Sequence, residues 1–273
     1  TKTDRSSPVL VVGGHTWASI SGGGSHNCGV TTTGEAYCWG RNWSSELGAG
    51  SISMDKGEPL PVLGGHTWAS ISGGGGHSCG VTTTGEAYCW GLNDRGQLGN
   101  GTTTNSTTPL LVSGGYNWTS IKAGALHTCG VTSFGEVYCW GGNGSGGLGD
   151  GTTTVRTTPV LVSGGHTWAS VSVGNGTGPG MGLTCGVTTT GEAYCWGGNG
   201  TGQLGDGTTT VRTTPVLVSG GITTWASVDG GGIHTCGRTT AGEVYCWGYN
   251  EDGQLGNGTT TNSLVPTKVG GNW

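Results

Sequence analysis

The ten cysteines of this chain fall into five pairs, and the two members of every pair are ten residues apart. Zinc ribbons and fingers place their ligands two to four residues apart, and that spacing is absent here. Regular pairing in a polar chain instead predicts five disulfides and an oxidising compartment. The pairs are Cys28 and Cys38, Cys79 and Cys89, Cys129 and Cys139, Cys185 and Cys195, and Cys236 and Cys246.

Each second cysteine lies within the sequence Tyr-Cys-Trp-Gly, which marks an internal repeat. The repeat recurs after 51, 50, 56 and 51 residues, counted from Cys38 to Cys246. The long step is one insertion at residues 173–183. Because the repeat covers almost the whole chain, we expect a single domain, residues 1–273. Its repeat cores are expected at about residues 17–67, 68–117, 118–167, 168–224 and 225–273.

Every repeat divides into four strand-like pieces. In the second repeat these are residues 67–72, 77–81, 86–90 and 109–112, the last opened by Pro109, as suits an edge strand. Repeated four-stranded units of about this length are typical of propeller blades. The sequence therefore predicts an all-β chain, a β-propeller of four-stranded antiparallel blades with five repeat cores.

Folding the hairpin about Thr33 brings Cys28 opposite Cys38 and Gly29 opposite Tyr37. Directly opposed residues of antiparallel strands are close enough for a disulfide. We therefore expect every bridge to lie within one blade. Tyr37 and Trp39 then lie on the other face of the sheet, where Gly29 leaves room for the tyrosine ring.

Composition excludes several classes of protein. The chain has 63 Gly, but they do not recur at every third position, which excludes collagen, and 12 Trp argue against disorder. The net charge is −5 and no stretch is rich in Lys or Arg, so we expect no nucleic-acid partner. No run of about 18 apolar residues is present, so we expect no membrane span. Thr1 is expected to be a processed or truncated start.

The long repeated motif resembles the regulator of chromosome condensation repeat. Its parts are read at residues 125–132, 135–143 and 96–102. The resemblance implies a β-propeller with four-stranded blades, of which the better-known members have seven. With five cores, this chain is a five-bladed ring, part of a larger ring, or an open array.

The two ends of the chain carry equivalent segments, residues 1–16 and 264–273. A segment that ends in Gly-Gly and then Trp occurs six times, whereas there are five cores; the tryptophans are Trp17, Trp68, Trp118, Trp168, Trp225 and Trp273. One terminal segment is therefore surplus. It either starts a further blade or adds a strand to a neighbouring molecule, which would give head-to-tail polymers.

Recurring polar residues offer few chemical sites. His26, His77, His127 and His234 precede the first cysteine of their blades and could ring a metal at the propeller axis. Repetition of the same histidine favours a structural role, with ring nitrogens bonded to a backbone loop. His15, His66 and His166 are expected at the surface, as are the hairpin glutamates Glu35, Glu86, Glu136, Glu192 and Glu243. We expect no metal, no cofactor and no catalytic residue, and hence no enzyme.

Eight Asn-x-Ser/Thr sequons are candidate glycosylation sites, although many are also Asn-Gly turns. They are Asn42, Asn100, Asn105, Asn117, Asn143, Asn175, Asn199 and Asn257.

These features favour an extracellular or cell-surface scaffold without catalytic activity. It would be a self-assembling surface or filament protein, or a protein-interaction module, with itself or another extracellular protein as partner. The alternatives are a multivalent glycan-binding lectin and a secreted inhibitor of an enzyme. Near-identical blades leave two irregular segments as candidate contact surfaces. They are the first-blade loop at residues 43–57 and the insertion, with Asn175, Thr177, Pro179 and Met181.

Overall fold

The computed structural model describes residues 6–52, 55–176 and 182–270. All of its regular elements are strands, and each repeat forms one four-stranded antiparallel sheet in which neighbours in the chain are neighbours in the sheet. The all-β, four-stranded-blade prediction is therefore confirmed. No helix of the described residues could cross a membrane.

The four strands of a blade recur at equivalent positions. The first strands are β1 (Trp17–Gly22), β5 (Trp68–Gly73), β9 (Trp118–Ala123), β13 (Trp168–Val173) and β17 (Trp225–Gly230). The second strands are β2 (His26–Thr31), β6 (His77–Thr82), β10 (His127–Thr132), β14 (Leu183–Thr188) and β18 (His234–Thr239). The third strands are β3 (Ala36–Gly40), β7 (Ala87–Gly91), β11 (Val137–Gly141), β15 (Ala193–Gly197) and β19 (Val244–Gly248). The fourth strands are β4 (Lys56–Pro61), β8 (Ser106–Leu111), β12 (Arg156–Leu161), β16 (Arg212–Leu217) and β20 (Ser263–Lys268).

The predicted strands of the second blade differ from these mainly at the fourth strand, since the bounds of the other three shift by at most one residue. The fourth strand of the second blade begins at Ser106, three residues before Pro109, so the proline lies inside the strand rather than opening it. This strand is the outer edge of its sheet, where the missing N–H of proline costs no ladder hydrogen bond.

The predicted hairpin register is confirmed. Cys28 lies opposite Cys38 and Gly29 opposite Tyr37. All five disulfides lie within single blades, with Cα–Cα distances of 4.0 to 4.1 Å. No free cysteine is present among the described residues.

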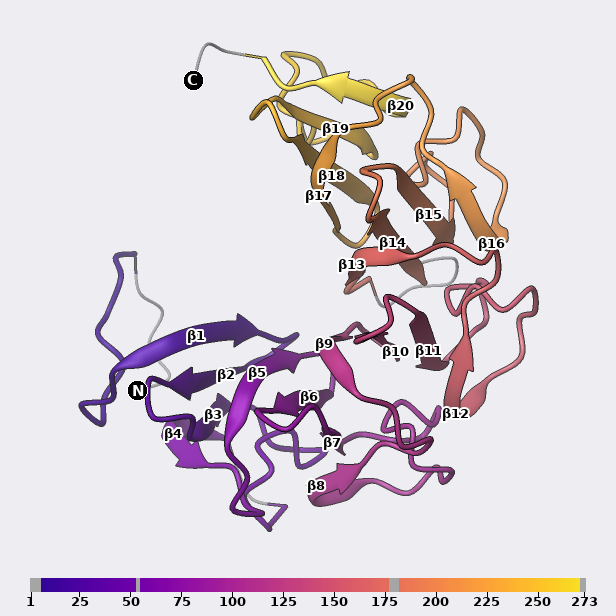
Figure 1. Cartoon of the computed structure of the whole chain (residues 1–273). Coiled ribbons are helices and arrows are strands. Elements are labelled where there is room, and N and C mark those ends of the chain that lie inside the picture. Colours follow the sequence, from indigo (N-terminus) through magenta and orange to yellow (C-terminus); the bar gives the residue numbers. More distant parts are fainter. Residues whose placement is uncertain (1–5, 53–54, 177–181, 271–273) are drawn as a thin grey trace.

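The five blades follow one another along an open arc, with β1–β4 at one end and β17–β20 at the other (Figure 1). The closed five-bladed ring, one of the alternatives that the sequence left open, is not formed. Strand β20 completes the last blade, whereas residues 6–16 belong to no sheet. Of the two equivalent terminal segments, the N-terminal one is therefore surplus.

Candidate interaction site

One face of each blade, here called the aromatic face, is a cluster of rings from its first and third strands. In the second blade, the ring of Trp68 lies 5.7 Å from Trp90 and 6.0 Å from Tyr88, between centroids. His66 lies 4.0 Å from Tyr88. His15, His66 and His166, which were expected at the surface, are partly exposed, and each packs its ring on the tyrosine of such a cluster.

The glycine after each first cysteine makes room for this cluster, although for a different ring than expected. A Cβ atom on Gly80 would lie 2.7 Å from the ring of Trp68. The tryptophan of the first strand therefore takes the space that we had assigned to the tyrosine.

The opposite face of each blade, here called the disulfide face, packs on the aromatic face of the next blade. One cluster joins Cys79, Cys89 and Leu98 of the second blade to Trp118 and Trp140 of the third. The other three joints repeat this arrangement. Burying large aromatic rings against a disulfide lets a chain with 32% hydrophobic residues form a continuous core.

A polar contact accompanies each apolar joint. The backbone carbonyl of Gln97 accepts hydrogen bonds of 2.9 Å from Trp140 Nε1 and from Thr128 Oγ1 of the next blade. Gly99, at a φ of +68°, lies against the same indole, since a Cβ there would lie 2.6 Å from Trp140 Nε1. The Gln-Leu-Gly segment of one blade is thus the part that enters the next. The carbonyls of Glu46, Gly147 and Gln203 bond Trp90, Trp196 and Trp247 in the same way.

The histidine of the second strand completes this contact. His77 Nε2 lies 2.9 Å from Thr128 Oγ1, and that hydroxyl already donates its hydrogen to Gln97. The imidazole therefore donates from Nε2. His26 and His127 make the same bond to Ser78 and Thr184. Among the described residues no group of side chains could hold a metal ion. His26, His77 and His127 thus bond a hydroxyl of the next blade, rather than the backbone loop that the structural interpretation had expected.

Burial sets the protonation of these histidines. Desolvation lowers the pKa of His77 from 6.5 to about 3, helped by the neighbouring imidazoles of His26 and His127. Desolvation also lowers the pKa of His26 and of His127 to about 4. Nδ1 of His77 is buried without a hydrogen-bond partner among the described residues, so a proton placed there would be unsatisfied.

The loop that carries the Gln-Leu-Gly segment is held by a buried asparagine. Asn143 Oδ1 accepts from Leu148 N at 3.0 Å, and its Nδ2 donates to the carbonyls of Thr152 and Thr154. Three of the sequon asparagines, Asn42, Asn143 and Asn199, occupy this position and are at most 1% exposed. A glycan has no room there, because the folded loop encloses the amide. The other five sequons stay predictions.

The first blade lacks a neighbour on its aromatic face. Trp17 and Trp39 are partly exposed and Ile20 is 54% exposed, whereas the equivalent Trp68 and Trp90 are 3% and 0% exposed. Asn27 stands in the place of Ser78 and is also exposed. The aromatic half of a blade-to-blade joint is therefore left uncovered on the first blade.

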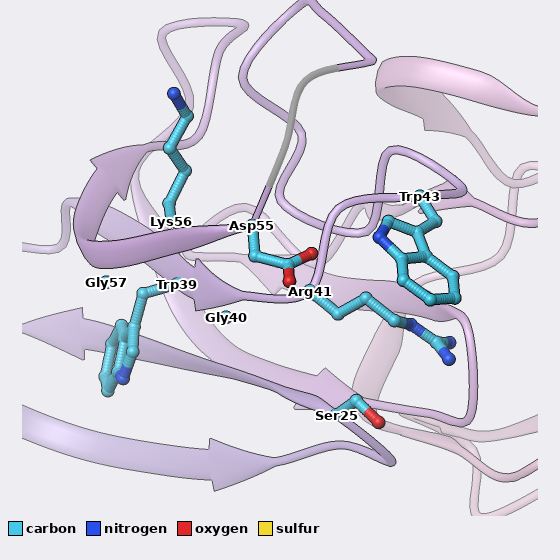
Figure 2. A pocket seen from close by; sticks show the side chains of 8 residues that line it. All are labelled: Ser25, Trp39, Gly40, Arg41, Trp43, Asp55, Lys56 and Gly57. Atoms are coloured by element: carbon cyan, nitrogen blue, oxygen red, sulfur yellow. The ribbon is translucent and has the colours of Figure 1, made fainter. Parts of the chain in front are cut away.

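A pocket of about 520 Å³ opens beside this face (Figure 2). Trp39 and Gly40 of β3 line it, together with charged side chains and Trp43, whose ring lies 5.8 Å from the guanidinium of Arg41. The pocket is lined in part by the first-blade loop at residues 43–57, which the sequence indicated as a candidate contact surface. The complete lining is Ser25, Trp39, Gly40, Arg41, Trp43, Asp55, Lys56 and Gly57.

The last blade lacks a neighbour on its disulfide face. Arg238 is exposed at the position where the other blades have buried valines such as Val81. Gly256 is exposed as well, whereas the equivalent Gly99 is buried. The two ends of the arc thus present the two complementary halves of one joint.

Sequence reasoning located some of these groups and missed others. Within the insertion, Asn175 is exposed, while Thr177, Pro179 and Met181 lie outside the described residues. The hydroxyl group that forms a hydrogen bond across each joint was not predicted, although the sequence carries a signal for it. The residue before the first cysteine is a serine or threonine in the four blades that have a preceding neighbour (Ser78, Thr128, Thr184 and Thr235), and Asn27 in the first blade.

Comparison with protein families decides the classification. Regulator of chromosome condensation (RCC1) repeats match residues 84–131, 135–177, 190–237 and 241–272, and a second description of the repeat matches residues 17–43, 68–97, 118–146 and 225–254. The chain belongs to the RCC1 repeat family. The resemblance seen in the sequence is thereby confirmed.

The curated proteins whose sequences match this chain are longer than it is. The ultraviolet-B receptor UVR8 of Arabidopsis thaliana is 34% identical over 97% of this chain, which corresponds to 49% of the receptor. The human E3 ubiquitin-protein ligase HERC2 is 30% identical over 93% of this chain and 5% of the ligase. The chain therefore spans at most about half of these relatives.

Solved structures agree on the fold. Human WBSCR16 matches with a TM-score of 0.81 and 21% identity, over 92% of this chain and 66% of that protein. Prp20p of Saccharomyces cerevisiae matches with a TM-score of 0.57 and 17% identity, over 93% and 76%. The ectodomain of the Physcomitrella patens receptor kinase CR4 matches with a TM-score of 0.56 and 23% identity, over 88% and 52%.

Proposed function

We propose that this RCC1-type propeller is a protein-binding scaffold that works outside the reducing cytosol and has no catalytic activity of its own. The observation that carries the proposal is the presence of a disulfide in every blade, which in the first four blades lies beneath the contact with the next blade. In the four blade-to-blade joints these cysteines are 0% exposed.

The disulfides support an oxidising location because the core depends on them. Each closes a short hairpin, which stabilises the folded chain by about 3 kcal/mol in the chain-entropy model. Thiol-reducing compartments do not maintain such bonds. A related fold occurs in the ectodomain of a plant receptor kinase, which is consistent with work outside the cell.

Protein binding is supported by the two uncovered faces and by the use of this fold elsewhere. The structure of Prp20p was described together with its binding to Gsp1p and histones. In this chain the exposed Ile20 and the half-exposed Trp17 and Trp39 provide the apolar centre that a protein interface needs.

The location is tested by fractionating the producing cells and alkylating accessible thiols before and after reduction. The proposal expects the protein in the extracellular or surface fraction, with all ten cysteines blocked until reductant is added. A cytosolic protein with free thiols would contradict the scaffold role.

Glycan binding is a second candidate, favoured by the 71% exposed Trp43 beside the pocket, because exposed indoles are flat platforms for sugar rings. A glycan array probed with the wild type and with Trp43→Ala tests it. Binding that the substitution abolishes would support a lectin, and an array silent at high protein concentration would exclude one.

A further inference from the structure

The third blade contains a pair of stacked tyrosines at a position where the other blades pair their tyrosine with a different side chain. The ring centroids of Tyr116 and Tyr138 lie 4.2 Å apart, and the ring planes are inclined by 33°. The residues that replace Tyr116 in the other four blades are His15, His66, His166 and Ile222. Among the described residues, this blade alone brings two phenol rings into contact.

The local chain holds Tyr116 against Tyr138. Gly114 and Gly115 precede Tyr116 with φ of +107° and +65°, and a Cβ atom on Gly114 would overlap the ring of Tyr116. The ring of Trp118 packs its edge on both tyrosines, 5.4 Å from Tyr116 and 6.1 Å from Tyr138 between centroids. The two phenols are thus in contact in the folded chain, and a reaction between them needs no further ordering of the backbone.

The hydroxyl groups of this pair have an acceptor for a proton beside them. They are hydrogen-bonded to each other, and Tyr138 Oη also donates to Glu136 Oε2 at 3.4 Å. Desolvation, together with these two neighbours, raises the pKa of Tyr138 to about 12. The phenol is therefore neutral at physiological pH, so its oxidation releases a proton as well as an electron. The carboxylate of Glu136 is placed to accept that proton.

The pair can be reached from solution. Tyr116 and Tyr138 are both partly exposed, whereas Trp118 and Trp140, which lie behind them, are 3% and 0% exposed. An oxidant in the solvent therefore meets the two phenols and is kept away from the indoles.

We propose that Tyr116 and Tyr138 form an oxidative cross-linking site, at which a haem peroxidase with hydrogen peroxide joins the two rings as dityrosine. Each phenol gives up one electron and one proton and becomes a phenoxyl radical, whose unpaired electron is shared with the ring carbons next to the C–O carbon. One such carbon of each ring bonds to the other, and the hydrogens on these carbons move to the oxygens and restore both phenols. Hydrogen peroxide takes up the two electrons and two protons and becomes two molecules of water.

The cross-link would complement the disulfide of the same blade. The bridge between Cys129 and Cys139 ties β10 to β11, whereas dityrosine would tie the segment before β9 to β11. Thiol reductants do not cleave a carbon–carbon bond, so this connection would survive reduction of the disulfides. It would also close residues 116–138 into a loop in the unfolded chain, which favours the folded state as a disulfide does. The inference does not rest on the scaffold role, because both rings belong to one blade.

Treatment of the dilute, purified protein with a haem peroxidase and hydrogen peroxide, with the disulfides intact, tests the inference. The monomer should lose the mass of two hydrogen atoms and gain dityrosine fluorescence, and peptide mapping should find Tyr116 linked to Tyr138. In the presence of reductant, the treated protein should melt at a higher temperature than the untreated protein. Tyr88 and Tyr194, which stack on histidines, are internal controls and should stay uncoupled.

Tyr116→His is the matched variant, because histidine already packs on the tyrosine at this position in three other blades. It should keep the fold and lose nearly all of the intramolecular dityrosine. Tyr138→Phe keeps the ring, removes the second phenol and should show the same loss. Equal yields of intramolecular dityrosine in the wild type and in Tyr116→His would overturn the inference. A wild type that forms dityrosine only in covalent dimers, or forms none while the peroxide is consumed, would overturn it as well.

Discussion

Trp90 Nε1 donates a 2.9 Å hydrogen bond to the backbone carbonyl of Glu46, which belongs to the preceding blade. The two residues are 44 positions apart, close to one repeat. Because each blade after the first repeats this bond, the chain is held together by a series of equivalent contacts between neighbours, as in other repeat proteins.

Removing one of these bonds should destabilise the protein measurably. Trp140→Phe leaves the buried carbonyl of Gln97 with one fewer donor and should lower the free energy of unfolding by about 2 kcal/mol. Chemical denaturation measures this. Trp39→Phe is the matched control, because no preceding blade supplies a carbonyl to Trp39. This substitution should lower the free energy of unfolding by less than about 0.5 kcal/mol. Equal losses in the two variants would contradict the assigned joint.

Breaking one disulfide should cost about 3 kcal/mol of unfolding free energy. The double variant Cys129→Ala with Cys139→Ala tests this at a central blade, by denaturation without reductant. Reduction of the wild type should lower the melting temperature by more than this variant does, since it opens five bridges instead of one. A variant as stable as the wild type would show that the bridges are dispensable.

Acid should weaken the joints. The pKa values of His26, His77 and His127 are about 3 to 4 in the folded chain and 6.5 when unfolded. The unfolded chain therefore binds more protons below pH 6.5, so stability is full above this value. Protonation of each histidine in the unfolded chain should lower the free energy of unfolding by about 1.4 kcal/mol per pH unit as the pH falls toward 4. Thermal unfolding from pH 7.5 to 4 measures the slope.

The fourth blade supplies a control for this pH dependence, since Leu183 stands there in place of the histidine. His77→Leu should make the slope shallower by about a third, because one of three titrating groups is removed. An unchanged slope would assign the acid sensitivity to other groups.

The buried asparagines should matter for folding and not for glycosylation. Asn143→Ala removes the bonds to Leu148, Thr152 and Thr154 and should lower the free energy of unfolding by about 3 kcal/mol. Asn117→Ala, at an exposed sequon, should change it little. In material from glycosylating cells, peptide mapping should find Asn143 unmodified, and a glycan on Asn143 in folded protein would contradict the structure.

Local features of the fold could be predicted because they depend on residues close in the chain. The spacing of Cys28 and Cys38 defined the hairpin, its register and the face that carries Trp39. The joints could not be predicted, because they link residues such as His77 and Thr128 that are 51 positions apart and belong to different sheets. The open arc depends on how these joints add up, and the uncovered aromatic face of the first blade became visible only when Trp39 could be compared with Trp90.

Oxidative footprinting of the tryptophans tests the central claim, that every blade joint is the same and that the arc ends in uncovered halves of it. In dilute protein, hydroxyl radicals followed by mass spectrometry should modify Trp17 and Trp39 readily and spare Trp90, Trp140, Trp196 and Trp247, which are 0% exposed. Protection of Trp39 equal to that of Trp90 in dilute monomer would mean that the arc is closed, and would contradict the account.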